Sequence, residues 1–132
     1  MSYHAELPAL SEAERSTLER YLDLLVETLG ERLLEVSVYG SVARGESWPP
    51  GMPIRSDLDL MVVTSEPVPA ETQTRLLDAT MPLFLESGRQ LGPVFRTPDE
   101  LEHPKAAAMA EYLEQFRRDA IVLYDASRRL RQ

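Results

Sequence analysis

The stretch VYGSVARGESWPPGMPIRSDLDLMVV, from Val38 to Val63, contains the features that decide the fold of this chain. Gly40 and Ser41 follow directly on an apolar run, and Asp57 and Asp59 open the next apolar run. Between the two runs, the prolines and the glycine of WPPGMP predict a loop. The stretch therefore predicts two strands, with polar residues gathered where the first ends and the second begins.

A helix is predicted before this stretch, in SEAERSTLERYLDLLVETLG. Ser11 and Glu14 form a capping-box pattern at its start, and Gly30 supplies its stop. Its apolar residues recur on one helical face: Leu18, Tyr21, Leu22, Leu25 and Leu29.

Two strands follow this helix. LLEVSVYG alternates Leu34, Val36 and Val38 with more polar residues, which is typical of a strand with one buried face. SVARGES predicts a short helix that begins directly after this strand, and LDLMVV predicts the second strand.

The segment 70–86 carries apolar residues at helical spacing, namely Leu77, Met81, Phe84 and Leu85. Pro82 must kink or interrupt this helix because it cannot donate the helical hydrogen bond. QLGPVF predicts a third strand, which Pro93 favours as an edge strand or an irregular one.

The last third of the chain predicts two helices and a strand. Thr97, Pro98 and Glu100 form a strong helix start, and a further helix is expected over about residues 104–118. AIVLYD predicts a short strand, and ASRRLRQ a solvated basic tail. The fold class is therefore α/β or α+β, with a small mixed sheet and helices packed mainly on one face. We expect a single domain over residues 1–132, with a core over about 15–125 and the tail over 126–132.

Composition restricts the partners and the compartment. The formal net charge of -8 disfavours nucleic acid, because such binding depends on lysines and arginines that neutralise phosphates. There is no cysteine, no secretory leader pattern and no apolar run of membrane-spanning length. We therefore expect a cytoplasmic location and no association with a membrane.

Asp57 and Asp59 point to the same side of a strand, whereas Leu58 and Leu60 point into the core, because successive side chains alternate between its faces. Two neighbouring carboxylates repel each other, and a divalent cation between them removes that cost. Mg²⁺ suits oxygen-only sites in which one or two carboxylates are bridged to substrate phosphates. Gly40 lets a phosphate approach the backbone, and Ser41 adds a hydroxyl at an expected helix N-terminus. Together the residues predict attack of a hydroxyl on the α-phosphorus of a nucleotide.

The motif GSVARGE followed by SDLDLMVV resembles that of the polymerase-beta-like nucleotidyltransferase superfamily. It is most similar to the minimal nucleotidyltransferases, a small group often paired with HEPN-domain proteins in toxin–antitoxin systems. The resemblance covers about residues 15–125 and implies the nucleotidyltransferase fold.

The resemblance also implies roles for individual residues. Gly40 and Ser41 would hold the phosphates of ATP, and Asp57 and Asp59 would be catalytic and would ligate Mg²⁺. Arg44 would face a phosphate or pack on the helix; alternatively, it would form an ion pair on the surface. Ser56 would bind the nucleotide or simply begin the second strand.

The chain departs from the family pattern in two respects. Fifteen residues separate Ser41 from Asp57, so SWPPGMPIR is expected to be an insertion at the mouth of the site. Active members carry a third carboxylate on the next strand, but SGRQLGPVFR contains neither Asp nor Glu, and Gly92 stands near the expected position. Asp99 or Glu100 could reach in from the next helix, although a capping role explains them more simply.

Two hypotheses therefore stay open. The first is an Mg-dependent nucleotidyltransferase that moves a nucleoside monophosphate, AMP from ATP, to a hydroxyl of a protein or small molecule, and that acts as antitoxin to a HEPN partner. The second is a catalytically inactive module of the same fold that binds a partner protein. The sequence leaves a homo-oligomer open.

Overall fold

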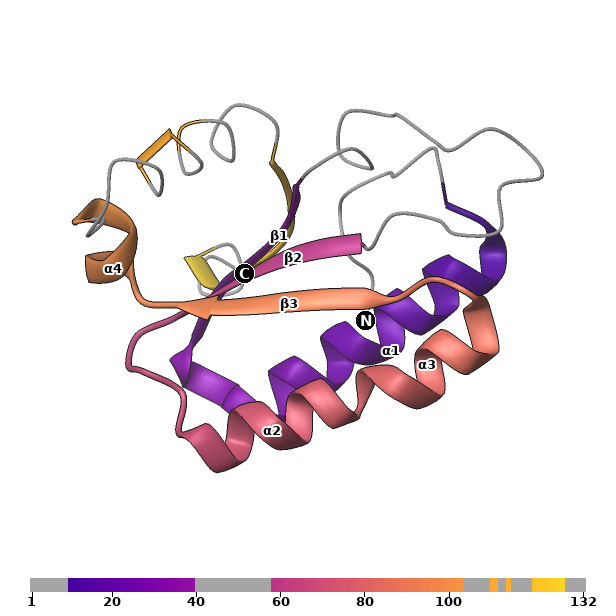
Figure 1. Ribbon diagram of the computed structural model, residues 1–132. Coiled ribbons are helices and arrows are strands. Elements are labelled where there is room, and N and C mark those ends of the chain that lie inside the picture. Colours follow the sequence, from indigo (N-terminus) through magenta and orange to yellow (C-terminus); the bar gives the residue numbers. More distant parts are fainter. Residues whose placement is uncertain (1–9, 40–57, 104–109, 112–113, 115–119, 128–132) are drawn as a thin grey trace.

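The computed structural model describes residues 10–39, 58–103, 110, 111, 114 and 120–127 (Figure 1). The short helix predicted after Ser41, the WPPGMP loop, most of the helix predicted over 104–118 and the end of the tail lie outside the described residues. The elements in chain order are α1 (Glu12–Leu29), the 3₁₀-helix η1 (Gly30–Arg32), β1 (Leu33–Tyr39), β2 (Leu58–Thr64), α2 (Ala70–Asp78), α3 (Thr80–Ser87), β3 (Leu91–Arg96), α4 (Pro98–Glu102) and β4 (Ile121–Asp125).

The strands form one mixed sheet in the order β3-β2-β1-β4. β1 is antiparallel to both β2 and β4, whereas β2 and β3 are parallel. A parallel pair needs a crossover connection, and α2 and α3 supply it. Figure 1 shows α1, α2 and α3 together on one side of the sheet. The predicted fold class, a small mixed sheet with helices mainly on one face, is confirmed.

The main core lies between α1 and the sheet. The five apolar residues predicted on one face of α1 are all buried, with Tyr21 and Leu25 at 0% exposure. They face Val36 and Val38 of β1 and the even-numbered apolar residues of β2. A smaller cluster on the opposite face joins Met61 and Val63 to Leu34, Val94, Leu101 and Ala120.

One prediction for β1 is wrong. Leu34 was expected beside Val36 and Val38, but Leu33 occupies the main core at 1% exposure and Leu34 packs against the smaller cluster. The pairing of β1 with β2 shifts between Leu33 and Glu35. Such an irregularity inserts one residue into the strand and so changes which residues face the core.

The helix predicted over 70–86 is interrupted, as expected, but at Ala79 rather than at Pro82. Pro82 has no N–H to offer the carbonyl four residues earlier, that of Asp78, so α2 ends there. Pro82 then sits in the first turn of α3, where a proline is tolerated. The Tyr21 hydroxyl donates to the Leu76 carbonyl (2.9 Å), which lies in the last turn of α2.

The apolar residues of this helix pair are on its exposed side. Leu77, Met81, Phe84 and Leu85 are exposed by 45%, 55%, 36% and 76%, and we call this surface the α2–α3 apolar face. The buried side of the pair is formed instead by Leu76 and Thr80, with Leu83 packed against the core. The helical spacing is therefore real, but it does not mark the buried face.

β3, α4 and β4 match the elements predicted from the sequence. β3 is an edge strand, where Pro93 is tolerated. Thr97 and Glu100 form a complete capping box at the start of α4. Among the described residues, no helix is both long and apolar enough to cross a membrane.

Candidate functional site

Asp59 lies in the second position of the central strand β2. It is therefore at the edge of the sheet that the strand ends form, not on an edge strand. Its neighbour on the antiparallel strand β1 is Tyr39, the last residue of that strand. Its neighbour on the parallel strand β3 is Gly92. The end of β1 and the beginning of β2 therefore meet at the same edge, because the two strands run in opposite directions.

The side chain of Asp59 faces away from the helix layer. Leu58 and Leu60, its neighbours in β2, are both 0% exposed in the main core, as the alternation predicted. Asp59 is half-buried on the other face, which it shares with Met61. This carboxylate is thus at the sheet edge, partly shielded from water and separated from the core.

The other predicted site residues, Gly40, Ser41, Arg44, Ser56 and Asp57, lie outside the described residues. The structure does not test their roles, which stay predictions. It does place Tyr39 and Leu58, which flank the segment containing all of them, at the edge where Asp59 lies.

β3 offers no third carboxylate beside Asp59. Gly92, near which an acid was expected and not found, is the β3 partner of Asp59. Glu100 accepts from the backbone N–H of Thr97 (3.1 Å), as its capping role predicted. α4 also follows Arg96, at the opposite end of β3. Within the described part of the chain, no group of three His, Asp or Glu side chains could hold a metal ion.

Asp59 has the donor chemistry that Mg²⁺ prefers. A half-buried carboxylate is a hard oxygen ligand, and Mg²⁺ is usually held by one or two such groups together with substrate phosphates. Asp59 would provide one ligand, and Asp57, one position before Leu58, would provide the second. Bound there, the ion would supply positive charge to the phosphates of a nucleotide.

A second pair of carboxylates lies elsewhere on the sheet. Glu35 of β1 is the register partner of Asp125 of β4. Burial, and then the nearby charge of Asp125, raise the pKa of Glu35 above its usual value. Glu35 also pairs with Val63, near the far end of β2 from Asp59, so these acids belong to a different part of the sheet.

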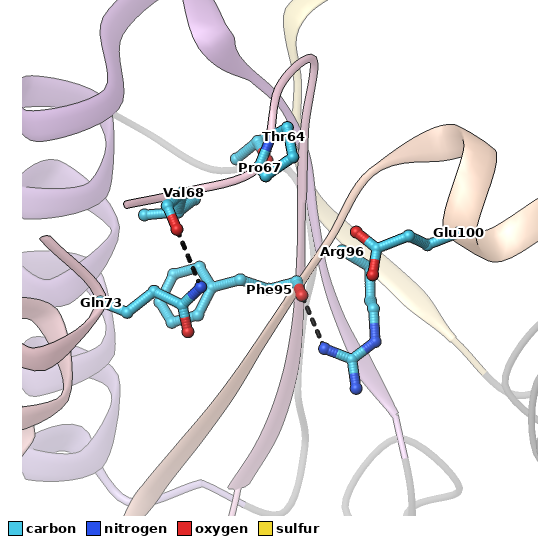
Figure 2. Close-up of a pocket in the computed structure, with 7 residues that line it drawn as sticks. All are labelled: Thr64, Pro67, Val68, Gln73, Phe95, Arg96 and Glu100. Carbon is cyan, nitrogen blue, oxygen red and sulfur yellow. Dashed lines mark hydrogen bonds between the residues drawn. The ribbon is translucent and has the colours of Figure 1, made fainter. Parts of the chain in front are cut away.

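A hollow of about 180 Å³ lies beyond the carboxyl ends of β2 and β3 (Figure 2). The polar side chains around it bond to nearby backbone: Gln73 donates to the Val68 carbonyl (3.0 Å) and Arg96 to the Phe95 carbonyl (2.7 Å). Arg96 is the β3 partner of Val63, four positions along β2 from Asp59. This hollow is therefore separate from the edge that carries Asp59.

The sequence did not reveal a buried ion pair. Arg89 Nε lies 3.0 Å from Glu14 Oε2, and the two side chains are 2% and 1% exposed. The capping-box pattern explained Glu14 by itself, and its backbone N–H does donate to the Ser11 hydroxyl (3.1 Å). No local pattern around Arg89 connects it with a residue 75 positions earlier.

Comparison with known families decides the identity of the fold. The sequence matches the nucleotidyltransferase domain family over residues 18–121, a range that contains both strands of the quoted stretch and Asp59. The chain belongs to the nucleotidyltransferase domain family. None of the curated proteins is significantly similar to it.

Several solved structures are similar to this chain. A candidate minimal nucleotidyltransferase is 30% identical, with a TM-score of 0.51 and a match that covers 89% of this chain and 96% of that one. A toxin–antitoxin structure with AMP-PNP is 16% identical, with a TM-score of 0.51 and coverage of 81% and 73%. A tri-AMPylated HEPN toxin of Shewanella oneidensis in complex with an MNT antitoxin is 12% identical, with a TM-score of 0.49 and coverage of 85% and 72%.

The resemblance to the minimal nucleotidyltransferases is therefore confirmed at the level of family and fold. Within this nucleotidyltransferase domain, the described edge of the sheet contains one predicted ligand, Asp59, and a glycine beside it on β3.

Proposed function

We propose that this chain is a metal-dependent nucleotidyltransferase that moves AMP from ATP to a hydroxyl group of a protein or small molecule. One observation carries the proposal: in a chain of this family, Asp59 lies half-buried where the end of β1 meets the beginning of β2. Gly40 and Ser41, predicted to bind phosphate, directly follow β1 in the sequence, and Asp57, predicted to bind metal, directly precedes β2.

Each residue would contribute one part of the site. Asp57 and Asp59 would hold Mg²⁺, and Gly40 would let the phosphates approach the backbone. The Ser41 hydroxyl would donate to a phosphate oxygen, while Arg44 and Ser56 would contact the nucleotide. These groups orient the α-phosphate and offset its charge, which are the main contributions of proteins to phosphoryl transfer.

The transfer forms one bond and breaks one. The acceptor oxygen bonds to the α-phosphorus, and the bond from that phosphorus to the oxygen bridging to the β-phosphate breaks. Pyrophosphate leaves with the bonding electrons, and the acceptor's proton passes to a base. The strand beside Asp59 carries no carboxylate to take this proton, so we expect slow turnover that depends on water or on the acceptor.

For the acceptor, we extend the proposal to a tyrosine of a HEPN partner, for which this chain would be the antitoxin. The fold similarity to a toxin–antitoxin structure with AMP-PNP supports a chain of this shape working beside a partner and a nucleotide. A cytoplasmic location is part of the same proposal.

A second candidate function is a non-catalytic module that acts by binding a partner protein. Two observations favour it: Gly92 stands where a third carboxylate is expected, and the α2–α3 apolar face exposes four large side chains. Exposed apolar patches of this kind are frequent at protein–protein interfaces.

Calorimetric titration with ATP and Mg²⁺ tests the proposal. We expect heat of binding with the wild-type protein and none with the Asp57→Ala, Asp59→Ala double variant. As a matched control, Asp99→Ala with Glu102→Ala removes two exposed acids of α4 and should leave binding unchanged. Equal heats from the wild-type protein and the Asp57, Asp59 variant would rule out the metal site.

Transfer of label from α-³²P-ATP to a co-expressed HEPN protein then separates the two candidates. Label on the partner that disappears in the Asp57, Asp59 variant supports the enzyme. Nucleotide binding without transfer, together with a stable complex, supports the binding module.

A further inference from the structure

The buried ion pair between Glu14 and Arg89 ties two distant segments together. Glu14 lies in the first turn of α1, and Arg89 lies in the connection between α3 and β3. Both side chains are almost wholly buried. The same connection is fixed from within, because the Ser87 hydroxyl accepts from the Arg89 N–H (3.1 Å). Gly88 adopts a positive φ of 79°, which favours glycine.

This connection leads directly to the candidate site. The carbonyl of Gln90, the residue after Arg89, accepts the backbone N–H of Leu58 at 2.8 Å. Leu58 is the first residue of β2 and the register partner of Leu91, and the next pair along is Asp59 with Gly92. Gln90 is held in turn by its side-chain amide, which donates to the Thr80 hydroxyl (3.0 Å). A continuous path of contacts therefore runs from Glu14 to the residue before Asp59.

Stability alone is a weak explanation for such a pair. Removing two charges from water is costly, and replacing a buried ion pair by apolar residues of similar size is often neutral or stabilising. What the pair does supply is a fixed point for the connection, since Arg89 Nε lies 3.0 Å from Glu14 Oε2 and both side chains are buried against the start of α1. A slip of one residue between β2 and the edge strand β3 would move Gly92 away from Asp59 and turn the side chains of β3 to the opposite face, because side chains alternate between faces.

We infer that Glu14 and Arg89 are positioning residues, which fix the register of β2 on β3 at the end where Asp59 lies. The inference rests on the proposed function in one respect, namely that Asp59 is a working ligand of the site. Neither residue is expected to touch metal or nucleotide.

The test is the double variant Glu14→Leu with Arg89→Met, which replaces the charges by apolar groups of similar size. Two measurements are made on it: amide hydrogen exchange, and affinity for Mg²⁺ and ATP. We expect an unchanged or raised melting temperature, but exchange at Leu58 at least about tenfold faster while Val62, in the middle of β2, keeps its protection. Nucleotide affinity should fall by about tenfold or more.

Arg89→Lys is the conservative control, since it keeps a charge that can reach Glu14, and it should retain most of the Leu58 protection and the affinity. A uniform loss of protection along β2, or unfolding of the double variant, would mean that the pair serves stability, and the inference would be overturned. Unchanged exchange at Leu58 would overturn it equally. If the wild-type protein binds no nucleotide, the proposed function fails, whereas the exchange at Leu58 still decides whether the pair fixes the register.

Discussion

Gly92→Asp places a carboxylate beside Asp59, at the position where the sequence lacks one. Gly92 is not among the described glycines with positive φ, and its extended backbone is a conformation that aspartate also adopts. Neighbouring strands lie about 5 Å apart, and residues paired across them share a face. The new carboxylate therefore lies close to that of Asp59.

The expected size of the effect follows from this separation. Two like charges about 5 Å apart repel by about 3 kcal/mol at an effective dielectric constant near 20. Asp59 is only half-buried, so we expect solvent to reduce the penalty to about 1–2 kcal/mol. For a domain of this size, 1 kcal/mol corresponds to about 4 °C, so the melting temperature should fall by about 4–8 °C.

Thermal melts of Gly92→Asp and Gly92→Asn measure this effect, because the two variants differ in charge but hardly in shape. In EDTA at neutral pH the Asp variant should melt lower. Mg²⁺ should reduce or reverse the difference, since a cation between the carboxylates offsets their repulsion. Acidification should also remove the difference, because protonation abolishes the charge. Transfer of labelled AMP should rise in the Asp variant alone.

Equal melting temperatures of the Asp and Asn variants in EDTA, with no response to Mg²⁺, would refute the reasoning. Residue 92 and Asp59 would then not share a charged site, and the parallel register of β2 and β3 would need revision.

Three further predictions concern stability. Tyr21→Phe leaves the Leu76 carbonyl without its buried donor. The free energy of unfolding, measured by urea titration, should therefore fall by about 1–2 kcal/mol. No change would mean that water replaces the hydroxyl. Leu76→Ala should lower the free energy of unfolding by about 2–4 kcal/mol, and Leu77→Ala by less than about 1 kcal/mol, because Leu76 is 2% exposed and Leu77 45%. Similar losses in the same titrations would contradict the described helix faces. Glu35→Gln should raise the melting temperature at pH 7 but not at pH 3. The pKa of Glu35 is higher in the folded protein than in the unfolded chain, so the folded protein binds more protons. The presence of Glu35 therefore lowers stability as the pH rises from the unfolded pKa through the folded one. A gain at pH 3 that equals the gain at pH 7 would exclude this cause.

Local patterns predicted most of the elements because each depends on nearby residues. The Thr97 capping box and the apolar face of α1 are set within one or a few turns, and the structure has both. The alternation around Asp59 similarly predicted that Leu58 and Leu60 would be buried. The resemblance to the family placed the missing acid near Gly92, and the register pairs Gly92 with Asp59.

The errors arise where distant residues decide the outcome. The irregularity after Leu33 depends on how β1 pairs with β2, which the alternation of one strand does not contain. The break at Ala79 reflects the missing partner of the Asp78 carbonyl, one turn before the proline that causes it. Phe84 and Leu85 have helical spacing but no neighbour in the described structure to bury them, which spacing alone does not reveal. The Glu14–Arg89 pair joins segments far apart in the sequence.

Mn²⁺ used in place of Mg²⁺ tests the location of the metal site most directly. With ATP present, substoichiometric Mn²⁺ should broaden the amide NMR signals of Asp59 and Gly92, which are paired at one edge of the sheet. Thr64, five residues along β2 and so about 17 Å away, should keep a sharp signal, as should Arg96. Broadening that begins at Thr64 and Arg96, or that spares Asp59, would contradict a nucleotide site at the junction of β1 and β2.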